Sequence, residues 1–251
     1  MIIMMLEVIF GENSFVVNVD PRFERTLQDK IPFTTTLNIW KEEIYFETPI
    51  DLDISGLKDH IKVETGKLYY WPPEKGFCIF YGFSQPYSPV YSIGSYVGVL
   101  DKFRTIEDGV KATVQAHKPA EVYGEIIDKL ESIRFEASTP LYRGERVIEA
   151  LGFIEGRRIA FRLYVEDYGI HLEGEPFFPH DYNPLTLRFM GELAALLSGE
   201  KHVRLDLNED HWVTITGYVK NLYELEEAIK ELGDAYCKIT RKSMRRRIKP
   251  L

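Results

Sequence analysis

The first 117 residues contain many short apolar stretches, rich in Val, Ile, Tyr and Phe, that alternate with turn residues. Stretches of this length and composition predict β-strands. Because so many short strands would leave exposed edges in an open sheet, we expect this half to close into a β-barrel or to pack as a sandwich. A short helix is expected after the second strand, with Asp20 as its N-cap and Pro21 in its first turn. The expected strands are residues 2–10, 14–19, 35–40, 43–48, 67–71, 77–82, 93–100 and 110–116.

The pattern changes after Lys118-Pro119, where helical periodicity appears between the strands. This order predicts an α+β half, with about three helices and an antiparallel sheet that they cover on one face. Val122 is expected on the apolar face of the first helix, together with Ile126 and Ile127. The expected elements are a helix over 120–133, strands over 148–154, 157–165 and 168–174, a helix opened by Asn183-Pro184, a hairpin of 201–207 with 211–218, and a helix that Asn221 caps and Gly233 ends.

Charge is distributed unevenly along the chain. Residues 119–234 carry a net charge of −11, whereas residues 235–251 hold seven basic side chains and no acidic one. We therefore expect three parts, a barrel domain over 1–118, an α+β domain of unknown role over 119–239, and a basic tail over 240–251.

The basic tail allows two interpretations. It could neutralise phosphates and make the protein RNA-associated. We favour a strap that docks on the protein's own acidic domain, because an acidic body repels a polyanion. The basic residues that would contact nucleic acid are Arg241, Lys242, Arg245, Arg246 and Arg247.

Composition excludes several classes of protein. Hydrophobic residues make up 45% and charged residues 28%, a balance typical of folded globular chains. The apolar start MIIMMLEVIF lacks a basic leader and meets Glu7, so we expect neither a signal peptide nor a membrane span. Cys78 and Cys237 cannot form a disulfide framework, which favours a cytoplasmic location. Three glutamines beside abundant Glu, Lys and Arg lean toward a heat-adapted source.

Three segments of the first half share their order and residue types with a known family. They are IPFTTTLNIWKEEIYFETPI, GKLYYWPPEKGFCIFYG and SPVYSIGSYVGVLDK. Over residues 3–116 the chain resembles a family of small, largely uncharacterised archaeal and bacterial proteins with a cyclophilin-like fold. The resemblance implies a closed barrel of that type with one or two short helices. Lys41 and Glu74 stand where the family usually has glycine, so we expect those two turns to differ in shape. Residues 119–251 resemble no family that we recognise.

The stretch YYWPPEKGFCIFYG is unusually aromatic, with six rings in fourteen residues. The interior of an eight-stranded barrel is only wide enough for side chains, so most of these rings are expected in the core. Rings at strand ends are instead expected to line an outer groove that binds a small or peptide-like ligand. Of the adjacent Glu42 and Glu43, which face opposite sides of a strand, one is expected to bond a backbone or tryptophan donor and the other to be solvated. The expected ligand-binding residues are Trp40, Glu43, Tyr45, Trp71, Pro72 and Pro73.

An enzyme is the alternative, either a divergent prolyl isomerase or one with a site between the domains. Cyclophilins carry a Phe-His-Arg strand motif and a Met-x-Gln-Gly-Gly motif, and the sequence contains neither. The arginines of the first half, Arg22, Arg25 and Arg104, fall in an expected helix or loop. GxSxG and GxxxxGK motifs are also missing, so hydrolase and nucleotide-binding functions have no support.

Metal and cofactor binding have weak support. His180, Asp181 and His211 offer imidazole and carboxylate groups that suit zinc or iron. The chain has no HxxxH or HxH spacing, however, and histidines in loops are usually surface groups. We therefore expect no metal and no cofactor.

Overall fold

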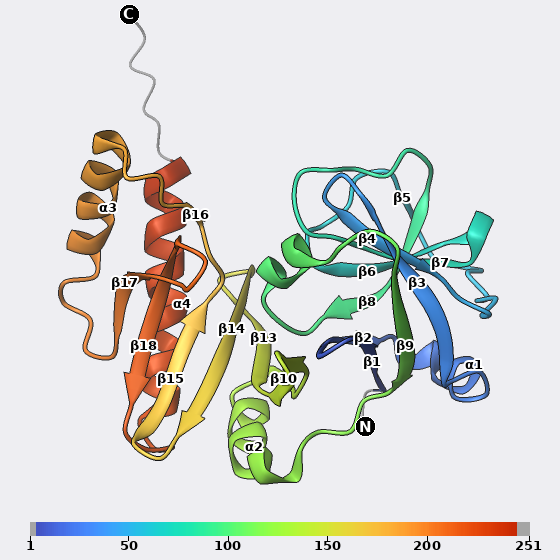
Figure 1. Ribbon diagram of the computed structural model, residues 1–251, viewed down its shortest axis with the longest axis horizontal. Helices are drawn as coiled ribbons and strands as arrows, with labels where there is room; N and C mark the ends of the chain where they lie inside the picture. The colour runs from blue at the N-terminus through green and yellow to red at the C-terminus, as the bar shows by residue number, and fades with distance from the viewer. Residues whose placement is uncertain (1–3, 245–251) are drawn as a thin grey trace, which may run out of the picture. The chain divides into compact units, whose positions relative to one another are not determined.

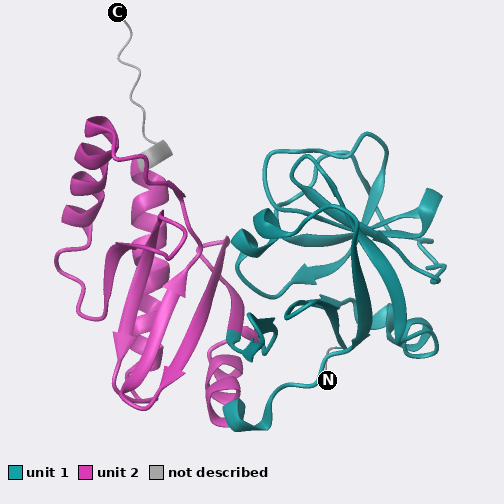
Figure 2. Cartoon of the chain, viewed as in Figure 1, with its two compact units in different colours: residues 1–124, 138–148 teal, residues 125–137, 149–251 magenta. Residues whose placement is uncertain are grey.

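The computed structural model describes residues 4–244 and divides the chain into two compact units (Figures 1 and 2). The barrel unit comprises residues 1–124 and 138–148. The α+β unit comprises residues 125–137 and 149–251. In the described part of the chain, no helix is long and apolar enough to cross a membrane.

The barrel unit is a closed antiparallel sheet, which confirms the predicted fold class. Its strands follow the order β2-β1-β9-β3-β4-β7-β6-β8, and β2 pairs with β8 to close the ring. The short strand β5, which the sequence did not indicate, pairs with the outer edge of β8. The elements are β1 Met5–Phe10, β2 Asn13–Val19, η1 Pro21–Phe23, α1 Glu24–Gln28, β3 Phe33–Trp40, β4 Glu43–Glu47, β5 Asp59–His60, β6 Lys67–Trp71, η2 Pro72–Glu74, β7 Gly76–Phe80, β8 Val90–Tyr96, η3 Leu100–Thr105, β9 Val110–Ala116 and η4 Glu121–Tyr123.

Strand alternation divides the aromatic stretch between the two faces of the barrel wall. Tyr70, Phe77 and Ile79 belong to the large interior core. Tyr69 and Phe80 belong to a separate buried cluster that the partly buried Tyr45 and Trp71 also join. Because successive side chains of a strand point to opposite faces, this second cluster lies on the outer side of the wall.

The described residues of the α+β unit form one sheet and three helices, as predicted. Its strands follow the order β10-β13-β14-β15-β18-β16, and β17 also pairs with β18. Helix α4 contacts β18, β17 and β14, and it runs along one face of the sheet in Figure 1. The elements are α2 Gly124–Ser132, β10 Glu136–Ser138, β13 Ile148–Ile154, β14 Arg157–Glu166, β15 Gly169–Gly174, β16 Phe178–Pro179, α3 Pro184–Leu196, β17 Val203–Leu207, β18 Trp212–Val219 and α4 Leu225–Met244.

Helix α4 does not end at Gly233, so that prediction was wrong. The helix continues to Met244. A Cβ atom built on Gly233 would lie 2.1 Å from Ile154 Cδ1, so the glycine lets the helix approach β13 closely. Gly233 therefore allows close packing within the helix and does not terminate it.

Two further local expectations differ from the structure, and one more is not tested by it. Val122 lies in η4, before α2, and 82% of it is exposed, so it does not join the apolar face of the helix. Asp20 caps the short 3₁₀ turn η1 through Arg22 N–H, and α1 follows that turn. The expected difference in turn shape from the relatives stays a prediction; in this chain Lys41 has a positive φ of 57°. At the other turn Lys75, and not Glu74, has positive φ.

Segment 138–148 is attached to the barrel unit through a buried ionic cluster. It carries the small hairpin of β11 Leu141–Tyr142 and β12 Glu145–Arg146. Glu7 on β1 is 1% exposed and accepts hydrogen bonds from Arg146 and from Ser14 Oγ, the latter at 2.6 Å. His117 Nδ1 lies 3.5 Å from the same carboxylate. The placement of the domain boundary at residue 118 stays a prediction.

This cluster has the residue types of a hydrolase triad but not its connections. His117 Nε2 accepts the Thr139 N–H at 3.1 Å, so the ring cannot take a proton from a serine. Burial alone would raise the pKa of Glu7, but hydrogen bonds from His117, Ser14 and Arg146 outweigh it and lower that pKa to about 2. The cluster is therefore a structural ion pair that ties the hairpin to β1.

Candidate ligand-binding site

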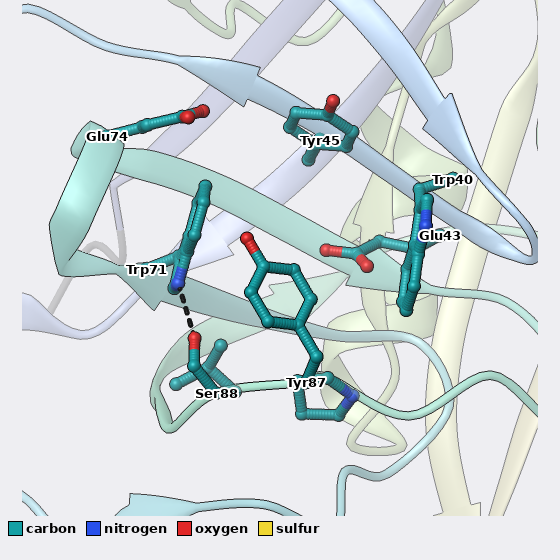
Figure 3. Close-up of a pocket in the computed structure, with 9 residues that line it drawn as sticks. Trp40, Glu43, Tyr45, Trp71, Glu74, Tyr87 and Ser88 are labelled. Carbon is teal, nitrogen blue, oxygen red and sulfur yellow. Dashed lines mark hydrogen bonds between the residues drawn. The ribbon is translucent and has the colours of Figure 1, made fainter.

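A pocket with a volume of about 260 Å³ opens on the outer side of the barrel wall (Figure 3). The ends of strands β3 and β6, the outer face of β4, and the segment that leads into β8 supply its walls. Its lining residues are Trp40, Glu43, Tyr45, Trp71, Glu74, Pro86, Tyr87, Ser88 and Val90.

Strand β4 directs two of the predicted residues into this pocket. Ile44 and Phe46 are buried in the interior core. Glu43 and Tyr45 alternate with them and therefore face outward. Trp40 and Trp71 are the last residues of their strands. Four of the six predicted site residues thus line one pocket, whereas Pro72 and Pro73 lie in η2 and outside the lining set.

Tyr87 completes the aromatic wall, and the sequence reasoning missed it. Its ring centroid lies 5.8 Å from that of Trp40 and 5.7 Å from that of Trp71, with interplanar angles of 73° in both cases. Trp71 Nε1 donates to Ser88 Oγ at 2.8 Å, which orients the indole (Figure 3). The missed signal was the stretch SQPYSP, in which one ring stands between prolines directly before a strand.

Glu42 and Glu43 have different environments. Glu42 accepts the Phe83 N–H at 2.6 Å, which confirms that one of the two bonds the backbone. Glu43 is only 8% exposed, so the expectation that the other carboxylate is solvated was wrong. Burial raises the pKa of Glu43 to about 7, and a hydrogen bond from the Cys78 thiol opposes this shift only in part. The carboxylate points between Tyr87 and Trp40 (Figure 3).

The charges around the pocket are mainly negative. The pKa of the Tyr45 hydroxyl is raised by burial and then by the charges of Glu74, Asp108 and Glu43. No Lys, Arg or His is among the lining residues, and Lys41 Nζ lies 4.2 Å from the centre of the Trp40 ring. Lys41 is outside the set of lining residues. The pocket therefore combines an aromatic wall with a negative field.

A second hollow is larger, at about 1060 Å³, and lies over β3 and β4. It is lined by the threonines at positions 34–36 and by Lys111. Thr35 Oγ1 already donates to Glu47 O, and Lys111 Nζ to Thr36 Oγ1, both at 2.8 Å. The lining of this second hollow is mainly polar and contains a single aromatic ring, whereas ligand sites usually have an apolar, aromatic lining, so we regard the aromatic pocket as the stronger candidate.

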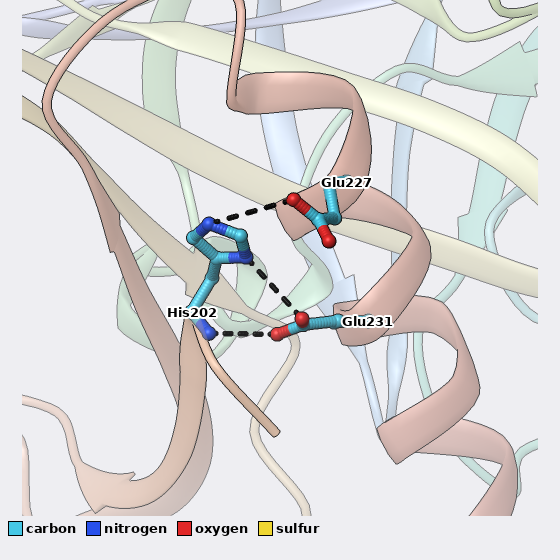
Figure 4. Close-up of side chains that lie close together, drawn as sticks. All are labelled: His202, Glu227 and Glu231. Atoms are coloured by element: carbon cyan, nitrogen blue, oxygen red, sulfur yellow. Dashed lines mark hydrogen bonds and ion pairs between the residues drawn. The ribbon is translucent and has the colours of Figure 1, made fainter.

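Three side chains of the α+β unit are placed as metal ligands could be (Figure 4). They are His202, before β17, and Glu227 and Glu231 on α4. In this group three potential ligand atoms lie within 4.8 Å of one another. Among residues 4–244, the histidines and aspartate that the sequence suggested, His180, Asp181 and His211, do not form such a group.

Existing bonds already account for most of this cluster. Glu231 accepts the His202 N–H at 2.7 Å and the Lys201 N–H at 3.1 Å, and it lies 3.2 Å from His202 Nδ1. Glu227 pairs with Lys201 Nζ at 3.4 Å. The cluster therefore acts first as an ion-pair network that joins β17 to α4.

The described basic residues near the C-terminus are bound to the protein itself. Arg241 on α4 pairs with Glu155, and Lys242 pairs with Glu192 at 3.4 Å. The other residues of the predicted nucleic-acid contact, Arg245, Arg246 and Arg247, lie outside the described residues.

The first half is thus a closed antiparallel barrel with an aromatic pocket on its outer wall. Residues 4–115, less than half of the chain, match the family described as cyclophilin-like. The matched residues are those that form the closed barrel, and the family match does not extend into the second half.

One similar solved structure is that of a hypothetical protein from Archaeoglobus fulgidus, at 29% sequence identity. The similarity covers 45% of this chain and 94% of that chain, with a TM-score of 0.38. Among curated proteins, none matches this chain.

Proposed function

We propose that the barrel unit is a binding module that takes a small or peptide-like ligand in its aromatic pocket. The observation that carries the proposal is the convergence of Trp40, Trp71 and Tyr87 around the carboxylate of Glu43 (Figure 3). An apolar, mainly aromatic lining with a few polar groups is the usual composition of a ligand site. A volume of about 260 Å³ suits a small molecule or a single side chain of a peptide.

Prolyl isomerisation has less support at this pocket. The twisted peptide of the transition state needs a positioned donor such as an arginine. Arg22 pairs with Asp20 at 3.1 Å, and neither Arg25 nor Arg104 is a lining residue. The pocket instead presents carboxylates, which would repel a developing negative charge on a carbonyl oxygen.

The first test uses the three tryptophans of the chain as reporters. Trp40 and Trp71 line the pocket, whereas Trp212 lies on β18 of the other unit. A panel of small fragments at millimolar concentration would be added to ¹⁵N-labelled protein, with the indole N–H signals recorded by NMR. We expect several fragments to shift the Trp40 and Trp71 signals and to leave that of Trp212 in place.

The control variant is Trp71→Phe, which keeps a ring and removes the hydrogen bond to Ser88. It should weaken the fragments that bind. If no fragment moves the two pocket signals, or if Trp212 moves with them, the pocket is not a binding site.

A further inference from the structure

We propose that the natural ligand of the aromatic pocket is an organic cation, an ammonium ion that carries alkyl groups on its nitrogen. This inference rests on the proposed function and names the class of its ligand. The faces of aromatic rings attract cations through their quadrupoles, and tryptophan does so most strongly. The pocket contains two tryptophans and two tyrosines.

The rings are arranged as walls and not as a stack. Tyr87 meets Trp40 and Trp71 at 73°, with centroid separations of 5.8 and 5.7 Å. The Tyr87 hydroxyl points into the pocket from between the two indoles (Figure 3). A rounded cation with methyl groups can touch several such walls at once, because its positive charge is spread over those groups. A flat neutral ring can stack on one wall and meet another edge-on, but it has no positive charge for the ring faces to attract.

Glu43 supplies the second, independent observation. It is 8% exposed, and among the described residues no Lys, Arg or His forms an ion pair with it. A buried carboxylate is unfavourable in its charged form unless a positive charge lies beside it. A bound ammonium ion would provide that charge, whereas a neutral ligand would remove water and leave the carboxylate unpaired. An anion would meet both Glu43 and Glu74.

Cation binding at this site must compete with protonation of Glu43. The groups around it are Cys78 on β7, Tyr45 on β4, Tyr87 before β8, and the more distant Glu74, Asp108 and Lys41. Burial raises the pKa of the Cys78 thiol, and burial with the nearby acids raises that of Tyr45, so neither ionises near neutral pH. Glu43 is therefore the group whose proton a cation would displace, and affinity should increase with pH up to about 7 and then level off.

The decisive comparison uses two ligands of nearly equal shape. Choline carries a quaternary nitrogen, and 3,3-dimethyl-1-butanol has a neutral carbon in its place. Calorimetry on the full chain at pH 8 should give choline an affinity about tenfold higher. Choline should release protons when it binds at pH 6.5, which calorimetry in buffers of different ionisation enthalpy detects. The neutral alcohol should show neither the higher affinity nor the proton release.

Matched variants locate the effect. Glu43→Gln should reduce choline affinity about tenfold, abolish its pH dependence and leave the neutral alcohol unchanged. Glu47→Gln changes the same residue type on the same strand, but that side chain is exposed and outside this pocket, so it should bind as the unchanged protein does. A short peptide that contains trimethyllysine is compared with choline. Tighter binding of the peptide would indicate that the natural cation is part of a peptide, and tighter binding of choline would indicate a free small molecule.

Several outcomes would overturn the inference. Equal or tighter binding of the neutral alcohol would remove the role of charge and leave the pocket as a site for neutral ligands. Choline binding that Glu43→Gln does not weaken would place the cation elsewhere. Failure of both ligands at millimolar concentration would exclude this ligand class, and the fragment panel with its tryptophan signals would then decide separately whether the pocket binds anything.

Discussion

Glu42 and Glu43 are adjacent and chemically identical, yet the barrel gives them different states. The Glu42 carboxylate binds the backbone N–H of Phe83 and supports the turn after β7. Glu43 points outward from β4 but is covered by the pocket walls, so it is buried without a positive partner. A residue kept in an unfavourable state usually indicates a functional constraint.

The burial of Glu43 predicts a pH-dependent effect on stability. Its pKa is about 7 in the folded protein and near 4.5 when exposed. Its stabilising contribution is therefore complete below about pH 4.5 and is lost as pH rises to about 7. Glu43→Gln, which cannot ionise, should raise the free energy of unfolding at pH 8 by roughly 1–3 kcal/mol and change it little at pH 4.5.

Urea denaturation at the two pH values measures this difference, with Glu47→Gln as the control for loss of a charge on the same strand. A Glu43→Gln variant less stable than the unchanged protein at pH 8 would show that the carboxylate is stabilised by its surroundings.

At the scale of elements, α4 shows how packing can change the meaning of a glycine. Glycine near the end of an apolar helical pattern normally indicates a C-terminal cap. Gly233 instead lies where the helix passes Ile154 of β13, and the helix continues for eleven more residues to Met244. The basic side chains of its last turn then reach Glu155 and Glu192. The longer helix thus places two residues that were assigned to a tail in ion pairs with the protein's own acidic side chains, and the strap itself stays a prediction.

Alanine substitutions distinguish packing from helix propensity. Replacing an exposed helical glycine with alanine stabilises by about 0.5–1 kcal/mol. Gly191 in α3 has no atom within 4 Å of a built Cβ, so Gly191→Ala should show that gain. Gly233→Ala should stabilise the protein by about 1 kcal/mol less than Gly191→Ala does, because its Cβ meets Ile154 Cδ1.

The companion change Ile154→Val removes the Cδ1 atom that the new Cβ would meet. In a protein that carries Ile154→Val, Gly233→Ala should therefore give most of the stabilisation expected of an exposed helical position. Thermal unfolding of the variants measures both effects. Equal effects of Gly191→Ala and Gly233→Ala in the unchanged background would show that the close approach to β13 has no energetic consequence.

At the scale of the whole molecule, the barrel unit takes in a segment that follows a helix of the other unit. Residues 138–148 return to β1 and β2, where Leu141 N–H donates to Ser14 Oγ at 2.7 Å and Arg146 binds Glu7. We still propose that a barrel cut between residues 116 and 121 folds alone, because its sheet closes without this segment. The cut barrel would lack Arg146, the arginine partner of Glu7.

This arrangement predicts that one substitution has different effects in two chains. Glu7→Gln should destabilise the full chain by roughly 3 kcal/mol, because it leaves Arg146 without its buried partner. In a chain ending at residue 118 the same change should have a much smaller effect, since Arg146 is missing. Denaturation of the four proteins measures both differences. A cut barrel that melts broadly would contradict the proposed boundary.

The sequence was sufficient for features that depend on neighbouring residues. Alternation along β4 places Ile44 and Phe46 inside and Glu43 and Tyr45 outside, and any barrel built from this strand would keep that division. The strand-end tryptophans followed from the same reasoning. Short strands with frequent turns predicted a barrel or a sandwich, because an open sheet would expose their edges, and the family resemblance implied the closed barrel.

Only the tertiary structure decided which distant segments meet. Tyr87 faces Trp40 and Trp71 because β8 pairs with β6 and the segment before β8 lies beside the ends of β3 and β6, a relation that no local pattern encodes. The burial of Glu43 follows from that cover, and the continuation of α4 through Gly233 follows from contact with β13. Local periodicity determines the face on which a side chain lies, whereas its solvation and partners depend on contacts between residues far apart in the chain.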